Sequence, residues 1–218
     1  MSRPTPPSAA PPSVPASGEP AALAAWLRGL PPSVGPVRLV AVDGHAGSGK
    51  STFATRLAAA LGEAAEPGGG PAPVVRLDDL ASHEALFAWT DRVRRQVLEP
   101  FAAGQPARHA VYDWVRGEFG PHRRELPPAP VVLVEGVGSG RRALRPYLAC
   151  LLWMDLPEAV GWERGRLRDG PEQARFWDGW TRAERTHFAG DPSLPHAHLL
   201  VSQGHGGYGV RRGPAGLP

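Results

Sequence analysis

Short apolar runs alternate along this chain with longer stretches in which apolar side chains recur every three or four positions. Several of the runs are apolar throughout, which is typical of strands that are covered on both faces of a sheet. Because the runs alternate with helical stretches, they predict a parallel sheet with functional residues at the carboxyl ends of its strands. The runs occupy residues 37–42, 74–77, 131–134, 149–154 and 198–201.

The stretches between the runs have the period of helices that pack against a sheet. Gly62 lies where a glycine often ends a helix, and Gly170-Pro171 divides the last stretch into two helices. Together with the runs, the stretches predict a three-layer α/β fold in which helices flank the sheet. They occupy residues 21–30, 53–61, 82–101 and 162–188.

Composition divides the chain into one domain and two tails. The first twenty residues are rich in proline, serine and alanine, and we expect them to be disordered because they offer little apolar surface to bury. Residues 21–203 are long enough for a single domain with a full core, and the glycine-rich residues 204–218 are predicted to form a flexible tail. No secretory signal or membrane-spanning run is recognisable, so no membrane partner is expected.

The loop after the first apolar run carries the most specific pattern of the chain. Gly44, Gly49, Lys50 and Ser51 match G-x-x-x-x-G-K-[ST], a pattern of phosphate-binding loops. Glycines let the backbone curl so that successive N–H groups point at a polyphosphate, beside the positive end of the next helix. The alternative is a chance glycine-rich turn, which the strand–loop–helix context disfavours. We therefore expect ATP to be bound by Gly44, His45, Ala46, Gly47, Ser48, Gly49, Lys50, Ser51 and Thr52.

Lys50 and Ser51 have separate roles in this prediction. Lys50 is the only lysine of a chain that otherwise uses arginine, which indicates that a compact ammonium group is needed at this position. It would reach the β- and γ-phosphates and take part in catalysis, while the Ser51 hydroxyl would bind Mg²⁺. ATP and Mg²⁺ are therefore the expected cofactors.

Acidic residues follow several of the apolar runs. Glu135 closes one run and is the natural partner of Mg²⁺, although a helix cap is the alternative. Asp78, at the end of another run, is the candidate base, and Asp79 is its alternative. One of the two would face the site while the other caps a helix that begins near residue 82. Asp43 and Asp155 are interpreted mainly as structural.

Arginines cluster in the stretch WERGRLR at residues 162–168. Arg164 and Arg168 share one helix face at i, i+4 spacing. Arginines that close over a γ-phosphate neutralise the charge that develops during phosphoryl transfer. A solvated charged face is the alternative. The break at Gly170-Pro171 favours a mobile lid that carries both arginines to the phosphate.

Five short motifs resemble the uridine kinase-like branch of P-loop kinases, over roughly residues 37–201. The resemblance implies a P-loop NTPase fold with a small helical lid. It also implies that Asp78 accepts the proton of the acceptor hydroxyl and that Asp79, Tyr112 and Asp113 contribute to substrate binding. The motifs are D-G-x-x-G-S-G-K-S at 43–51, L-D-D at 77–79, Tyr112-Asp113, V-E-G at 134–136 and R-x-x-x-R-D at 164–169.

The chain departs from this family beside the Tyr-Asp pair. Uridine kinases follow the pair with a histidine and an arginine that help to hold the nucleoside. Here Gly117 and Phe119 occupy those places. The resemblance therefore covers the phosphate-binding motifs and not the pyrimidine-binding ones.

The residues and the resemblance together predict a Mg²⁺-ATP-dependent kinase that phosphorylates a hydroxyl of a small metabolite, a nucleoside or a related acceptor. The alternative is a P-loop ATPase or a nucleotide-binding regulatory protein without a small-molecule acceptor. A GTPase would need an Asn-Lys-x-Asp motif to read its base. The chain has no asparagine and no second lysine, so a GTPase that reads its base with this motif is excluded.

Charge and cysteine content narrow the expected partners. The net charge of +3 and a pI near 9.6 make the chain mildly basic, which anionic small substrates explain as well as nucleic acid does. Without a dense basic run or a recognisable module, no nucleic-acid partner is expected. The single cysteine, Cys150, excludes an intrachain disulfide and suits a reducing cytoplasm. Whether the chain forms a homo-oligomer stays open.

Overall fold

A six-stranded sheet lies at the centre of the structure, a computed structural model that describes residues 19–66 and 68–218. Five strands are parallel and the sixth, β8, is antiparallel to β7. The predicted disordered segment falls almost entirely outside the described residues. In spatial order the strands are β2 (Val74–Arg76), β5 (Val131–Glu135), β1 (Arg38–Asp43), β6 (Cys150–Met154), β7 (Leu199–Gly204) and β8 (Gly207–Arg212).

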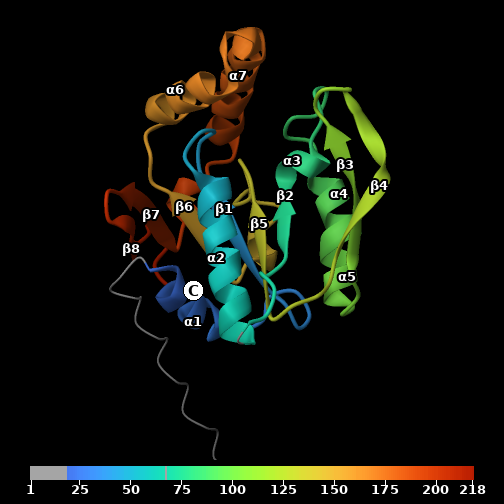
Figure 1. Ribbon diagram of the computed structural model, residues 1–218, viewed down its shortest axis with the longest axis vertical. Helices are drawn as coiled ribbons and strands as arrows, with labels where there is room; N and C mark the ends of the chain where they lie inside the picture. Colours follow the sequence, from blue (N-terminus) through green and yellow to red (C-terminus); the bar gives the residue numbers. More distant parts are fainter. Residues whose placement is uncertain (1–18, 67) are drawn as a thin grey trace, which may run out of the picture.

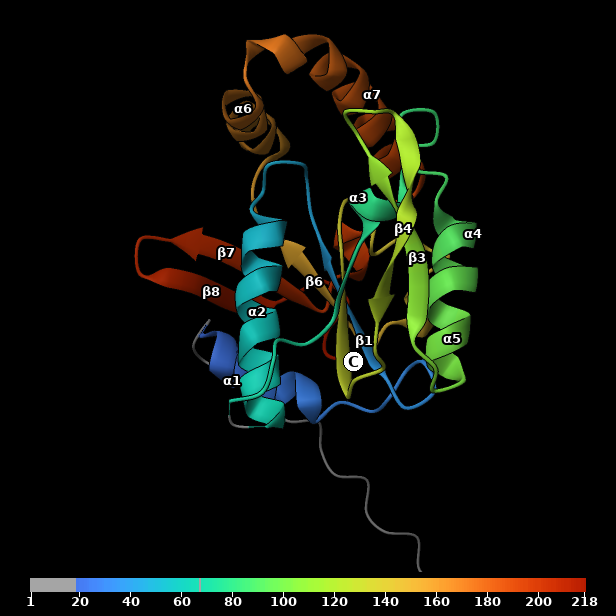
Figure 2. The ribbon, with the colours of Figure 1, turned by 45° about the vertical axis from the view of Figure 1, so that its right-hand side comes forward.

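Helices cover both faces of this sheet (Figures 1 and 2). Successive residues of β1 point to opposite faces, because side chains alternate along a strand. Val40 and Val42 pack against α1 (Pro20–Arg28) and α2 (Lys50–Ala65). Leu39 and Ala41 belong to a second core on the other face. The predicted three-layer α/β architecture is therefore confirmed.

The second core is closed by one continuous helix and a hairpin (Figure 2). The helix consists of α4 (Thr90–Val93), a π-helical turn (Arg94–Leu98) and α5 (Glu99–Ala102). The hairpin pairs β3 (Ala107–Asp113) with β4 (Glu118–Leu126) and was not predicted, because most of β4 is polar and exposed.

The expected helix over residues 82–101 begins only at Thr90. Leu86, which contributed to the helical period, and its neighbour Phe87 pack against a separate cluster that contains Trp180 instead of facing the sheet. Their chain segment is therefore a loop, and the prediction was wrong for residues 82–89.

Two further helices, α6 (Glu158–Asp169) and α7 (Ala174–Gly190), stand beyond the carboxyl ends of the strands (Figure 1). They are separated at Gly170, as predicted. The remaining elements are the short helix α3 (Leu77–Leu80) and the 3₁₀ turns Arg145–Tyr147, Pro171–Gln173 and Leu194–His196. Within residues 19–66 and 68–218, no helix combines the length and apolar character needed to cross a bilayer.

The C-terminal residues differ from the expected flexible tail. Residues 207–212 form β8, and Tyr208 and Val210 pack against the core on the α2 side. The glycines that suggested flexibility build the turn of a hairpin, in which Gly207 has a φ of +122°. This part of the chain therefore extends the sheet.

Gly62 does not end its helix, contrary to the prediction, because α2 continues to Ala65. A Cβ atom on Gly62 would lie 2.0 Å from the carbonyl oxygen of Gly70. The missing side chain allows the loop after α2 to cross the helix closely. Glycine is required here by packing and not by a helix terminus.

We predict that Gly62→Ala lowers the free energy of unfolding by about 1–3 kcal/mol, because the new methyl group must displace the backbone at Gly70. Gly179→Ala is the matched control, since Gly179 is helical and a Cβ atom there meets nothing within 4 Å. The control should raise the free energy of unfolding by about 0.5–1 kcal/mol. Urea denaturation measures both, and equal effects would contradict the proposed contact.

Candidate active site

The phosphate-binding loop predicted from the sequence joins the end of β1 to the start of α2. Gly44, Gly47 and Gly49 have φ angles of +143°, +76° and +90°, which side-chain-bearing residues rarely adopt. Helix α2 then begins at Lys50, so the positive end of the helix faces the loop. The predicted order of strand, curled loop and helix is confirmed.

Asp43 holds this loop to its neighbour. Its carboxylate accepts hydrogen bonds from the backbone N–H of Gly44 at 2.7 Å and from those of Gly138 and Gly140 at 2.8 Å each. Gly138 and Gly140 belong to the loop after β5. The buried carboxylate thereby fixes the loops after β1 and β5 relative to each other, which agrees with the structural role expected for Asp43.

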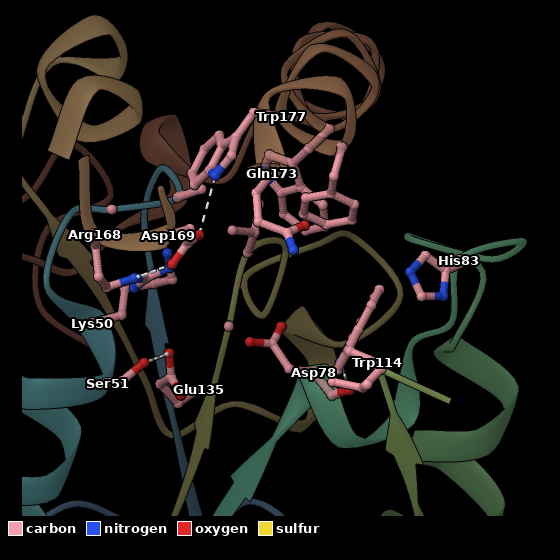
Figure 3. A pocket seen from close by; sticks show the side chains of 17 residues that line it. Lys50, Ser51, Asp78, His83, Trp114, Glu135, Arg168, Asp169, Gln173 and Trp177 are labelled. Atoms are coloured by element: carbon pink, nitrogen blue, oxygen red, sulfur yellow. Dashed lines mark hydrogen bonds and ion pairs between the residues drawn. The ribbon is translucent and has the colours of Figure 1, made fainter. Parts of the chain in front are cut away.

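Lys50 and Ser51 lie at the start of α2, directly beside the carboxyl end of β5. The ammonium group of Lys50 donates to the carbonyl oxygens of Gly44 and His45, at 2.9 and 2.8 Å. The Ser51 hydroxyl donates to Glu135 Oε1 at 3.1 Å (Figure 3). The structure thus brings together the lysine, the hydroxyl and the carboxylate that the sequence assigned to phosphate and Mg²⁺.

A cavity of about 670 Å³ opens in front of these residues. Figure 3 shows Asp78 on the opposite side of it from Lys50, with Trp114 and His83 beyond Asp78 and Trp177 above. A smaller hollow of about 160 Å³ adjoins the phosphate loop. It is lined by Gly47, Gly49, Lys50, Ser51, Thr52, Arg164, Gly165 and Arg168.

Asp78 is in the first turn of α3, and its carboxylate opens onto the larger cavity. Water reaches it from the cavity, but protein atoms crowd its other sides. This desolvation raises the pKa of Asp78 above 3.8, although the positive charges of Lys50, Arg76 and Arg168 oppose the rise. A carboxylate with a raised pKa is better suited to accept a proton than an ordinary one.

Glu135 is buried at the end of β5. Burial raises its pKa above 4.5, and the negative charge of Asp78 adds to this effect, while Lys50, Arg76 and the Ser51 hydroxyl oppose it. Two neighbouring carboxyl groups that resist ionisation, one at the end of β5 and one in α3, suit a divalent cation, because the cation would compensate both charges.

The donor set near Ser51 fits Mg²⁺, which prefers oxygen ligands and usually keeps several waters. Glu135 supplies carboxylate oxygens and Ser51 supplies a hydroxyl. Within the described chain, no three His, Cys, Asp or Glu side chains are grouped closely enough to hold a metal by themselves. A cation here would therefore also depend on the phosphates of the nucleotide.

Several residues at the site, Arg76 and His83 among them, were missed in the sequence. Arg76, in β2, donates to Glu135 Oε2 at 3.0 Å and to Thr55 Oγ1 at 3.3 Å. His83 lines the cavity from the loop after α3. Neither residue has a local signal, since a single arginine in a strand and a histidine in a loop are common.

Three residues that the resemblance assigns to substrate binding lie outside the cavity lining. Asp79 forms an ion pair with Arg124 of β4, and no helix begins near residue 82 for it to cap. The Tyr112 hydroxyl is hydrogen-bonded to His83, 2.8 Å from Nδ1. Asp113 accepts the backbone N–H groups of residues 115 and 116, each at 2.9 Å. These side chains support the cavity wall instead of forming it.

Arg164 and Arg168, the arginines expected to act from a lid, line different parts of the site. Arg168 lines both hollows and forms two hydrogen bonds with Asp169, at 2.7 and 3.0 Å. Arg164 lines only the smaller hollow, next to the phosphate loop. Trp177 donates its indole N–H to Asp169 at 3.1 Å, so the end of α6 is tied to α7.

Solved structures share this fold, although no protein-family model and no curated protein matches the chain. A possible uridine kinase from Bacillus stearothermophilus superposes with a TM-score of 0.59 at 16% identity, over 84% of this chain and 96% of that one. The chain has the fold of a P-loop kinase. The protein YGR205w also matches, with a TM-score of 0.50 at 11% identity over 81% of this chain and 90% of that one.

The structure of a candidate fructose transport system kinase from Silicibacter sp. TM1040 also matches, over a smaller share of this chain. Its TM-score is 0.47 at 25% identity, over 66% of this chain and 78% of that one. The fold shared with the first two structures confirms the resemblance seen in the phosphate-loop motif. The identities are low, so the likeness concerns the fold and leaves the acceptor to be judged from the cavity.

We predict that Asp78→Asn raises the melting temperature at pH 7, although only slightly, because solvent at the cavity screens this exposed residue. Because the pKa of Asp78 is higher in the folded than in the unfolded protein, its ionised form opposes folding. The stabilisation by asparagine should appear as pH rises through this raised pKa and vanish below about pH 3.8, where both states bind the proton. Thermal denaturation across this range measures it.

Glu84→Gln serves as the control, because Glu84 is an exposed carboxylate outside the cavity lining. It should leave the melting temperature unchanged at every pH. A lower melting temperature for Asp78→Asn at pH 7 would show that the Asp78 carboxylate stabilises the folded protein, contrary to the direction of its pKa shift.

Proposed function

We propose that this chain is a Mg²⁺-ATP-dependent kinase that phosphorylates a hydroxyl group of a small metabolite. One observation carries the proposal: Lys50, the Ser51–Glu135 pair and Asp78 all line a single cavity. Phosphoryl transfer needs a phosphate cradle, a cation site and a group that accepts the acceptor's proton. The cavity offers candidates for all three.

The phosphate loop and its neighbours would hold the nucleotide. Backbone N–H groups of the loop and the start of α2 would bind the β- and γ-phosphates, with Lys50 neutralising their charge. Ser51 and Glu135 would hold Mg²⁺, directly or through water. When bound there, the ion would help to neutralise the negative charge of the β- and γ-phosphates.

Asp78 would orient the acceptor hydroxyl and take up its proton. Its place across the cavity from Lys50 leaves room for the acceptor between the base and the phosphates (Figure 3). Arg168, which borders both hollows, would neutralise charge on the migrating phosphoryl group, and Arg164 would assist from the nucleotide side.

The far end of the cavity indicates the chemistry of the acceptor. Its walls carry His83, Trp114, Phe176 and Trp180. Among the described lining residues, Lys50 and Arg168 are the only lysine and arginine, and both lie near the phosphate loop. Aromatic walls without cations favour an acceptor with a flat or apolar body and disfavour one that already carries a phosphate or carboxylate.

We predict that Lys50→Ala lowers turnover by about 100-fold or more, because the charge that develops on the phosphates loses its cation. ADP release should be screened across neutral hydroxyl compounds and anionic ones, with the Lys50→Ala protein as the blank. Arg95→Ala, which removes an exposed cation outside the cavity, is the control. Full activity of Lys50→Ala would refute the proposed site, and acceptor-independent ADP release would indicate an ATPase.

Asp78→Asn should lower kcat by about 10²–10⁴-fold while the affinity for Mg²⁺-ATP survives, because only proton transfer is removed. Asp79→Asn should instead leave kcat largely unchanged, since Asp79 pairs with Arg124 and lies outside the cavity lining. In the unsubstituted protein, kcat should fall as pH drops through the raised pKa of Asp78, above the ordinary value of 3.8. A normal kcat for Asp78→Asn, with a loss for Asp79→Asn, would move the base to Asp79.

A further inference from the structure

Glu184 of α7 is a fully buried carboxylate that the proposed reaction does not use. Two indole N–H groups donate to it, from Trp180 at 2.8 Å and from Trp162 of α6 at 3.2 Å. Burying a charge is costly unless it is paired and hydrogen-bonded. Such a group therefore needs further partners, and it finds them in the phosphate loop.

Two consecutive residues of the phosphate loop complete the shell of Glu184. His45 Nδ1 lies 2.7 Å from Oε1, and the backbone N–H of Ala46 donates to Oε2 at 3.2 Å. The imidazole of His45 is held edge-on by Trp153 and Phe188, with ring centroids 5.3 and 5.1 Å away. These contacts hold the loop at His45 and Ala46, immediately before Gly47, whose φ is positive.

A second contact joins the same part of the loop to α6. A Cβ atom on Gly47 would lie 1.8 Å from the carbonyl oxygen of Gly161, and one on Gly161 would lie 2.6 Å from that of Ala46. The two backbones therefore touch. Both lid helices are docked on the loop, α6 through glycine packing and α7 through the Glu184 carboxylate.

Glu184 remains ionised in this setting. Burial raises its pKa, but the hydrogen bonds from His45 and Trp180 and the positive charge of Lys50 outweigh burial and hold the pKa below its ordinary value. A negative charge next to a loop that binds phosphates would repel them if it were free. Here its hydrogen bonds direct it to the side of the loop that faces α7.

We propose that Glu184 is a positioning residue that fixes the phosphate loop against the lid helices through His45 and Ala46, and thereby sets the affinity for triphosphate. The inference rests on the proposed function and extends it to a residue on the lid. Trp180 links Glu184 to the proposed acceptor site, because its indole donates to Glu184 and its side chain lines the cavity. Loop geometry and cavity wall are therefore held by the same helix.

Glu184→Gln in the full chain tests the proposal. The amide keeps the shape of the side chain, but it replaces one acceptor oxygen with a donor and removes the charge. Titration calorimetry should find binding of Mg²⁺-ATP about tenfold weaker, the size expected for one lost hydrogen bond to a charged group. Inorganic tripolyphosphate with Mg²⁺ should lose affinity equally, because it contacts the loop without a base or ribose.

Two further variants sharpen the test. Glu163→Gln removes an exposed carboxylate of α6 and should leave both affinities unchanged. His45→Gln should weaken both probes, and the double variant with Glu184→Gln should bind about as well as the weaker single variant. Such non-additivity is expected of residues that act through one contact.

Each outcome decides the matter. A folded Glu184→Gln protein that binds both probes as tightly as the unsubstituted chain overturns the inference, whether or not its melting temperature falls. If Glu184→Gln does not fold, unchanged binding by His45→Gln overturns it and weakened binding supports it. If the unsubstituted protein itself binds neither probe, the proposed function fails and the inference fails with it.

Discussion

The backbone contact between Gly47 and Gly161 leaves no space for a side chain on either residue. It presses the phosphate loop against the first turns of α6, while Asp43 ties the same loop to the loop after β5. Because the loop is fixed from both sides, Lys50 and Ser51 are presented at the carboxyl edge of the sheet. The cavity and its chemistry depend on this arrangement.

Buried carboxylates around this edge are satisfied in different ways. Asp43 binds backbone amides, Glu135 binds Ser51 and Arg76, and Glu184 binds indole, imidazole and amide donors. Asp78 differs from them: within the described part of the chain, no donor is hydrogen-bonded to its carboxylate, which faces the cavity. A carboxylate left without a protein partner is the one available to a substrate.

The end of the cavity beyond Asp78 is built by elements distant in sequence. Trp114 comes from the tip of the β3–β4 hairpin, His83 from the loop after α3, and Trp180 from α7. Their support lies behind them, where Tyr112 binds His83 and Asp113 holds the hairpin turn. The Tyr-Asp motif therefore supports this end of the cavity without lining it.

Local patterns in the sequence determined the strand–loop–helix unit of Lys50 and Ser51, the parallel core and the break at Gly170, because burial on both faces and left-handed backbone are encoded by neighbouring residues. Only the tertiary structure decided the positions of Arg76 and the β3–β4 hairpin, and the contact between Glu184 and His45, 139 residues apart. Such contacts join segments that are far apart in the sequence, and no local pattern shows which of their residues will meet. Packing, and not propensity, therefore selected them.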